Sequence, residues 1–235
     1  MLGKTDLSEH LLKKPFMKSV FNLRPPKCRY VFTWSFGKVL SYFTTLYPNR
    51  NLSLKLPTLK CVALIALATA QRSQTLVALD LNHLFVMDTS VVFEINYLIK
   101  TSKPGHTDFQ VKLDKYQNKA ICPVTTLKSY IKRTNKMRKS QRLFVSFKTL
   151  KAIKSSTISR WLKLVLSQSG IDIQKFKVHS LRGTSQSAAC RAGVSLKDIL
   201  TTANWSSAST FRRFYFRDIN VENTTYTSTV FADNT

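Results

Sequence analysis

The sequence predicts a mainly α-helical protein with one small three-stranded antiparallel sheet, an α+β fold. Over most of the chain, apolar residues recur at helical spacing. Between His83 and Leu113 the pattern changes to the alternation that is typical of half-buried strands. Hydrophobic residues make up 43% of the 235 residues, which is enough for an ordinary core.

Two helices are expected before Pro57, at about residues 8–22 and 33–46. Residues 24–27, Arg-Pro-Pro-Lys, separate them because proline cannot continue a helix. In the second helix one stripe is apolar, so this helix should pack against something larger; the stripe consists of Val39, Leu40, Phe43 and Leu46. We interpret residues 1–56 as a partial N-terminal helical segment and linker.

Pro57 stands where the first turn of a helix tolerates proline. The apolar run that follows predicts a helix that is buried nearly all round and ends close to Arg72. Three strands are then expected at residues 83–87, 93–97 and 109–113. Lys100 and Lys103 fall in the second hairpin.

Helices dominate the rest of the chain. Pro123 opens one, and a serine N-cap near residue 155 opens another. Residues 179–192 predict a further helix, and Ser195 with Asp198 forms the capping-box pattern of the next. A last short helix is expected to carry Tyr215.

The charge of the chain is strongly positive, formally +25, from 37 Lys and Arg against 12 Asp and Glu. Between Asp114 and Asp172 there is no acidic residue, while Lys and Arg recur throughout. Such a stretch is typical of a surface that follows the phosphates of a nucleic acid. A solvated basic face or a ribosome-associated surface would give the same charge.

The four cysteines are Cys28, Cys61, Cys122 and Cys190, and they lack the paired spacing of metal sites. They are expected to be reduced thiols, and no metal or other cofactor is expected. The longest apolar run, residues 61–70, is too short to cross a bilayer, and no leader opens the chain. We therefore expect an intracellular protein without a membrane partner.

His179 and Arg182 stand three residues apart, so on a helix both side chains could reach one phosphate. A guanidinium fork matches two phosphate oxygens and stays charged. This pair alone is a weak pattern, and Tyr215 among three phenylalanines would more often belong to a core. The same holds for Trp205, and a hairpin lysine such as Lys100 is usually only solvated.

These residues occur together and in order, and this order resembles a known family signature. His179-Ser180-Leu181-Arg182-Gly183, followed by residues 203–215 with Trp205 and Tyr215, resembles the tyrosine recombinase (phage integrase) family. The likeness is closest to recombinases of eukaryotic mobile elements, of the DIRS and Crypton kinds. It implies a catalytic domain over residues 57–217 and a C-terminal tail at 218–235.

The resemblance implies a role for each of six residues. Tyr215 would attack the scissile phosphate and form a 3′-phosphotyrosyl link, without metal or ATP. Arg72 and Arg182 would bind the non-bridging oxygens, and His179 would accept or orient the tyrosine proton. Lys100 would protonate the leaving oxygen, with Lys103 of the same hairpin left open as the alternative. Trp205 stands where many relatives have a second histidine. The implied partners are double-stranded DNA and further copies of the chain, as dimer or tetramer, in the nucleus.

Some features depart from the family pattern. Thr75 replaces an acid that braces the first arginine in many relatives, and the spacing from Trp205 to Tyr215 is one residue longer than in bacterial members. The segment before Pro57 is short for the usual DNA-clamping domain. Three alternatives stay open: a DNA-binding descendant that has lost turnover, a type IB topoisomerase, and a basic ribosomal or RNA-binding protein.

Overall fold

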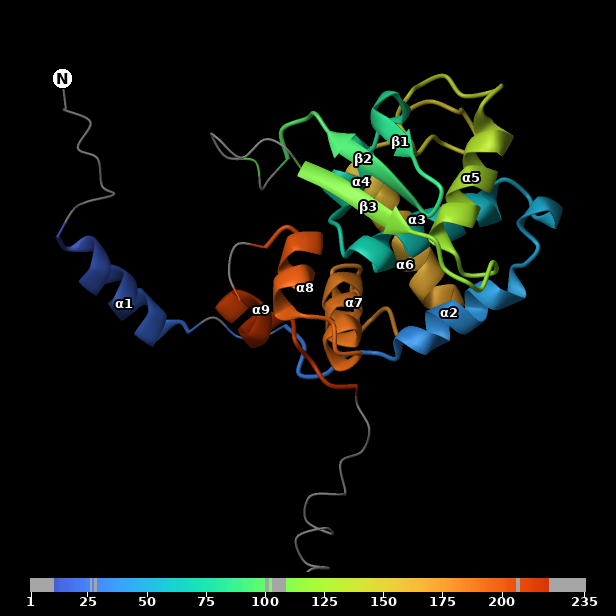
Figure 1. Ribbon diagram of the computed structural model, residues 1–235. Helices are drawn as coiled ribbons and strands as arrows, with labels where there is room; N and C mark the ends of the chain where they lie inside the picture. The colour runs from blue at the N-terminus through green and yellow to red at the C-terminus, as the bar shows by residue number, and fades with distance from the viewer. Residues whose placement is uncertain are drawn as a thin grey trace, which may run out of the picture.

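The computed structural model describes residues 11–25, 27, 29–99, 102, 109–205 and 208–219 of the chain. It confirms the predicted fold class, because most elements are helices and one small antiparallel sheet lies at one side of the molecule (Figure 1). The elements are α1 (Lys13–Leu23), α2 (Phe36–Thr45), η1 (Asn49–Asn51), α3 (Lys55–Thr69), α4 (Ser73–Ala78), η2 (Leu81–His83), β1 (Leu84–Val86), β2 (Ser90–Ile95), β3 (Phe109–Asp114), α5 (Pro123–Thr134), α6 (Ser155–Gln168), α7 (Ser180–Arg191), α8 (Leu196–Thr202) and α9 (Ala208–Phe214).

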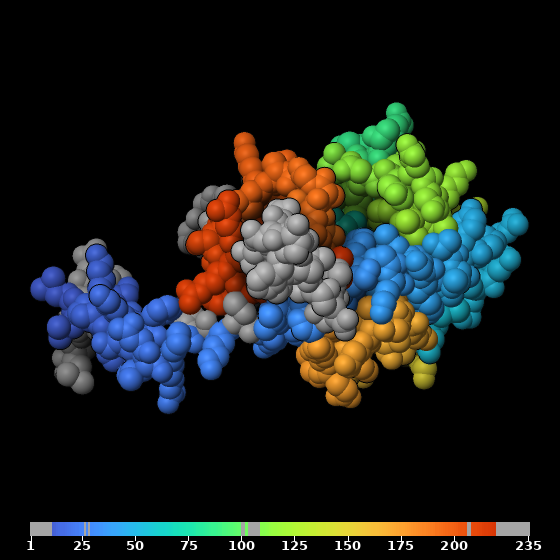
Figure 2. Space-filling view, turned by 90° about the horizontal axis from the view of Figure 1, so that it is seen from below, coloured from blue at the N-terminus to red at the C-terminus, as the bar shows by residue number. Residues whose placement is uncertain are grey.

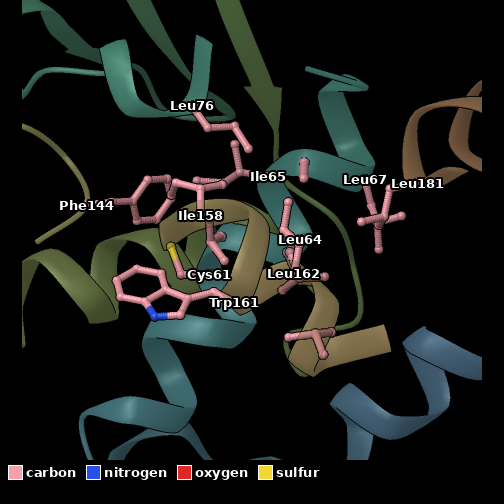
Figure 3. Close-up of a cluster of buried hydrophobic side chains, with 14 of the residues drawn as sticks. Cys61, Leu64, Ile65, Leu67, Leu76, Phe144, Ile158, Trp161, Leu162 and Leu181 are labelled. Carbon is pink, nitrogen blue, oxygen red and sulfur yellow. The ribbon is translucent and has the colours of Figure 1, made fainter. Parts of the chain in front are cut away.

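Helix α3 is the centre of the core, and it is buried nearly all round, as predicted. It packs against α5, α6, α7 and β3, which together cover its sides. In Figure 3 Cys61 and Ile65 of α3 lie beside Ile158 and Leu162 of α6. Each buried aliphatic side chain of this kind contributes about 1.5–3 kcal/mol by leaving water.

The helix was predicted to end close to Arg72, and α3 ends shortly before it, at Thr69. Ala70 adopts a left-handed conformation with φ of 51°, which stops the helix. The chain then turns, and Arg72 precedes α4, a helix that the sequence analysis did not predict. Arg72 therefore lies in a turn between two helices.

The sheet has the order β1-β2-β3, and both pairings are antiparallel. Phe93 of β2 stands opposite Leu84 of β1 and Val111 of β3. The prediction of a strand at residues 93–97 is shifted, because β2 begins at Ser90 and ends at Ile95. Strand β2 is buried on both faces at most positions, so its early part lacks the polar alternation by which strands are recognised.

The last three helices, α7, α8 and α9, lie side by side at one end of the molecule (Figure 1). Ser195 caps α8 as predicted: its Oγ accepts a hydrogen bond from the Asp198 amide, 3.1 Å away. Two predicted positions are corrected. His179 precedes the first residue of α7, and Tyr215 follows the last residue of α9.

Helix α1 extends away from the rest of the molecule in both views (Figures 1 and 2). Near its C-terminal end the Phe21 ring contacts α9, with the ring centre 5.2 Å from the Arg213 guanidinium carbon. None of its residues is buried, and several of its large apolar side chains are exposed, among them Phe16, Met17 and Val20.

Cys61 and Cys122 are buried free thiols, as expected, and Cys190 is a half-buried free thiol; Cys28 lies outside the described residues. Within the part of the chain that the structure describes, no helix has the length and apolarity needed to cross a bilayer. The same part holds no group of three or more His, Cys, Asp or Glu side chains that could bind a metal ion.

Candidate active site

A cavity of about 600 Å³ lies between α7, the end of α9 and the segment before α2. Tyr215, His179 and Arg72 line it together, although they are distant in sequence. Three further cations line the same cavity: Lys27, Arg29 and Arg217. None of the described lining residues is acidic. A cavity with this lining suits an anion of the size of a phosphodiester.

His179 and Tyr215 form a direct pair at this cavity. The His179 Nε2 lies 3.0 Å from the Tyr215 hydroxyl oxygen, and the two rings meet edge to face with centroids 5.6 Å apart. When Nε2 carries no proton, it accepts the hydrogen bond from the phenol. This geometry allows the imidazole to take the phenol proton.

The charge of the surroundings favours the neutral form of His179. Its side chain is exposed at the cavity, yet neighbouring atoms displace part of its water, and this desolvation lowers its pKa below 6.5. The positive charges of Arg182, Arg29 and Arg72 lower the pKa further. At neutral pH the ring is therefore unprotonated and can act as a base.

Tyr215 is half-buried and is held from three sides. The Trp205 ring meets it edge to face with centroids 4.3 Å apart. The Ser187 Oγ donates a hydrogen bond of 2.9 Å to the Tyr215 carbonyl, and the Tyr215 amide donates to the Phe211 carbonyl. The side chain is thus fixed through its ring and backbone while its hydroxyl stays at the cavity.

Arg182 is a buried cation, only 3% exposed. Its guanidinium carbon lies 4.7 Å from the centre of the Trp205 ring, and its Nη2 donates a hydrogen bond to the Ala203 carbonyl. Within the described residues, its Nε and Nη1 have no hydrogen-bond partner. Unpaired donors on a buried charge are costly, so a bound anion would stabilise this residue.

Burial lowers the pKa of Arg182 to about 9, and the positive charge of Arg72 adds to this shift. The arginine still carries its proton at neutral pH. It does not line the Tyr215 cavity. It lines a smaller cavity of about 180 Å³ together with His179 and Gln71.

Arg72 is placed by the turn between α3 and α4. The neighbouring Gln71 side chain fixes this turn, since its Nε2 donates a hydrogen bond of 2.7 Å to the Thr202 carbonyl of α8. Arg72 is half-buried and faces the same cavity as Tyr215.

The structure thus gathers five of the six predicted site residues. Arg72, His179 and Tyr215 share one cavity, while Arg182 and Trp205 lie directly beside it. Among the described residues the Trp205 Nε1 has no hydrogen-bond partner. Lys100 and Lys103 lie outside the described residues.

Sequence reasoning missed the contribution of the N-terminal segment. Lys27, Arg29 and Tyr30 line the cavity, although residues 1–56 read only as a helical segment and linker. No spacing rule links these positions to Tyr215. The proline tract at residues 24–27 indicates an interruption between helices, but it does not predict where the chain that follows it lies.

Solved structures of two recombinases and an integrase share this fold. XerH bound to its difH substrate is 17% identical with a TM-score of 0.57, over 75% of this chain and 47% of that one. XerA recombinase is 18% identical with a TM-score of 0.57, over 94% and 72%. A lambda integrase dimer bound to a COC′ core site is 15% identical with a TM-score of 0.53, over 88% and 57%. The chain spans about half the length of XerH.

The fold is therefore that of the tyrosine recombinase catalytic domain. At the level of sequence, residues 48–220 match the phage integrase family. Because this match spans most of the chain, the protein belongs to the phage integrase family. A sequence search of curated proteins finds no match.

Proposed function

We propose that the protein is a DNA strand transferase that breaks and rejoins DNA through a 3′-phosphotyrosyl intermediate. The observation that carries this proposal is the 3.0 Å contact between His179 and Tyr215 in a cavity lined by cations. A phenol is a weak nucleophile at neutral pH and needs a base beside it. His179 is such a base.

In the proposed reaction the Tyr215 oxygen attacks the phosphorus and forms a new P–O bond. The phenol proton passes to the His179 Nε2, and the bond from phosphorus to the 5′-oxygen breaks. Arg72 and Arg182 stabilise the charge that develops on the non-bridging oxygens. Lys100 or Lys103 protonates the leaving 5′-oxygen. A 5′-hydroxyl of another strand then reverses these steps and releases Tyr215.

Double-stranded DNA is the proposed partner, bound by two or four copies of the chain. The formal charge of +25 supports it, and so do the DNA complexes of XerH and of lambda integrase, which include a dimer and a tetramer. We further propose that the catalytic domain comprises residues 57–217, and that the protein acts in the nucleus as a mobile-element recombinase of the DIRS or Crypton kind.

The test is capture of the covalent intermediate on nicked duplexes whose sequence is randomised around the nick. Loss of the short fragment traps the adduct, which denaturing gels detect and sequencing of the bound DNA assigns to a site. We expect an adduct with the wild-type chain and none with Tyr215→Phe. Tyr116→Phe, at an exposed tyrosine away from the cavity, is the matched control and should react normally.

The second candidate is a DNA-binding descendant of a recombinase without turnover. One observation favours it: Arg182 does not line the Tyr215 cavity. If this candidate is correct, the wild-type chain and Tyr215→Phe should bind DNA equally well and with the same salt dependence. The wild-type chain should then form no adduct on any nicked duplex.

A further inference from the structure

From this cavity we infer that Arg29, in the segment before the catalytic domain, is a further phosphate-contacting residue of the active site. The inference deepens the proposed function and rests on it for the reaction itself. Residues 29–33 are named the strap below. The strap places Arg29 in the same cavity as Tyr215, His179 and Arg72.

The strap is fixed to the elements that carry the site. The Lys177 amide donates a hydrogen bond of 3.1 Å to the Tyr30 hydroxyl, just before α7. The Thr33 side chain is hydrogen-bonded to that of Thr184 in α7. Tyr30 and Phe32 both pack on Phe176, with ring centroids 5.7 and 5.9 Å apart.

The strap is also joined to the segment that follows Tyr215. The Thr33 amide donates a hydrogen bond of 2.9 Å to the Asp218 carbonyl, and Thr33 pairs in parallel with Ile219. The Arg217 Nε donates a hydrogen bond of 2.6 Å to the Tyr30 carbonyl. Arg29 therefore stands on a backbone that is fixed relative to the nucleophile.

Among the cations that the N- and C-terminal segments bring to the cavity, Arg29 is the one best suited to a ligand. The Arg217 guanidinium is already occupied, because it donates to the carbonyls of Tyr30, Phe216 and Arg213. Arg29 is exposed and forms no ion pair within the described residues. Its charge reaches the site, since it contributes to the lowered pKa of His179. Arg29 also differs from Lys27, because its planar guanidinium can donate hydrogen bonds to two phosphate oxygens at once.

The experiment compares Arg29→Ala and Arg29→Lys with Arg24→Ala in the full chain. Arg24 is an exposed cation of the same segment that does not line the cavity. Binding to a duplex of about 30 base pairs is measured over a range of salt concentrations, and adduct formation is timed on the nicked pool. Thermal unfolding checks that each variant is folded.

For Arg29→Ala we expect the slope of log K against log salt to fall by about one. Adduct formation should slow by about tenfold or more, because a cation near the developing charge is lost. Arg29→Lys should restore the slope but only part of the rate, since lysine lacks the fork. Arg24→Ala should resemble the wild type.

Two results would overturn the inference. The first is an unchanged salt slope and an unchanged rate of adduct formation in Arg29→Ala. The second is an equal loss of slope and rate in Arg24→Ala, because the effect would then come from the overall charge of the chain and not from the position of Arg29 at the cavity. If the wild-type chain forms no adduct, the proposed strand transfer fails. The salt slopes then still decide whether Arg29 binds a phosphate.

Discussion

His179 lies between the phenol of Tyr215 and several guanidinium groups, and this position determines its protonation. Its pKa is below 6.5, so the ring becomes neutral as the pH rises through that lowered value. The rate of adduct formation should therefore rise with pH on the acid side and level off before neutrality. A pH–rate profile on the nicked duplex measures this.

The control for that profile is His179→Gln, which keeps a hydrogen-bonding side chain but cannot take a proton. We expect its rate to be lower by roughly 10²- to 10⁴-fold and its acid limb to vanish. An acid limb that persists in His179→Gln would show that another group accepts the proton.

Arg182, a proposed phosphate-binding residue, illustrates a cost that such a buried cation imposes on the free protein. Its buried Nε and Nη1 lack partners within the described residues, so Arg182→Met should leave stability unchanged or raise it by about 1 kcal/mol. The same variant should form no adduct. Thermal unfolding without DNA and the adduct assay measure the two effects, and a drop of several degrees in Tm would contradict the explanation.

At the residue scale, chain order and residue type were sufficient to nominate the site. His179, Arg182, Trp205 and Tyr215 form a local signature, and the fold brings Arg72 to them. The position of Arg182 beside the cavity could not be predicted, because it depends on how Trp205 and Ala203 pack around the guanidinium.

Among the elements, α2 and α3 are joined by one buried lysine. Lys60 of α3 is fully buried, and its Nζ donates hydrogen bonds of 2.9 and 3.1 Å to the carbonyls of Phe43 and Leu46 at the end of α2. Burial lowers the pKa of Lys60 to about 8. The ammonium caps the C-terminal end of α2, where backbone carbonyls lack donors from the next helical turn.

Lys60 makes stability depend on pH. In the unfolded chain it keeps its proton up to the ordinary pKa of 10.5, whereas the folded chain releases it at about 8. Between these values the unfolded state binds more protons, so the free energy of unfolding rises with pH, by about 1–3 kcal/mol. Lys60→Met should lack this rise. Urea unfolding at about pH 7.5 and about pH 9.5 tests it, and parallel behaviour of both proteins would contradict it.

The elements with strong local patterns were predictable. Three predictions agree with the structure: the apolar run of α3, the proline at the start of α5 and the cap of α8. Helix α4 was missed because the stop at Ala70 requires a left-handed alanine, which a sequence pattern does not indicate. The ends of β2 were shifted because burial on both faces removed its alternation.

On the scale of the whole molecule, α1 stands apart from the core. Because none of its residues is buried, Val20→Ser should change the free energy of unfolding by no more than about 0.5 kcal/mol. The matched core variant Ile65→Ala in α3, at a fully buried position, should cost about 2–5 kcal/mol. Chemical denaturation measures both, and a large loss in Val20→Ser would mean that the Val20 side chain packs against the body.

The strap was beyond prediction because its contacts join positions at opposite ends of the described chain. Periodicity describes neighbours a few residues apart, whereas Thr33 meets Asp218 and Ile219. Only the folded structure shows that residues before α2 complete the cavity of Tyr215.

The pairing of Thr33 with Ile219 has a consequence for biosynthesis. A ribosome makes the earlier partner long before the later one, so a growing chain holds the core helices before it can close this contact. The residues around the Tyr215 hydroxyl can therefore reach their folded arrangement only after Ile219 has been synthesised.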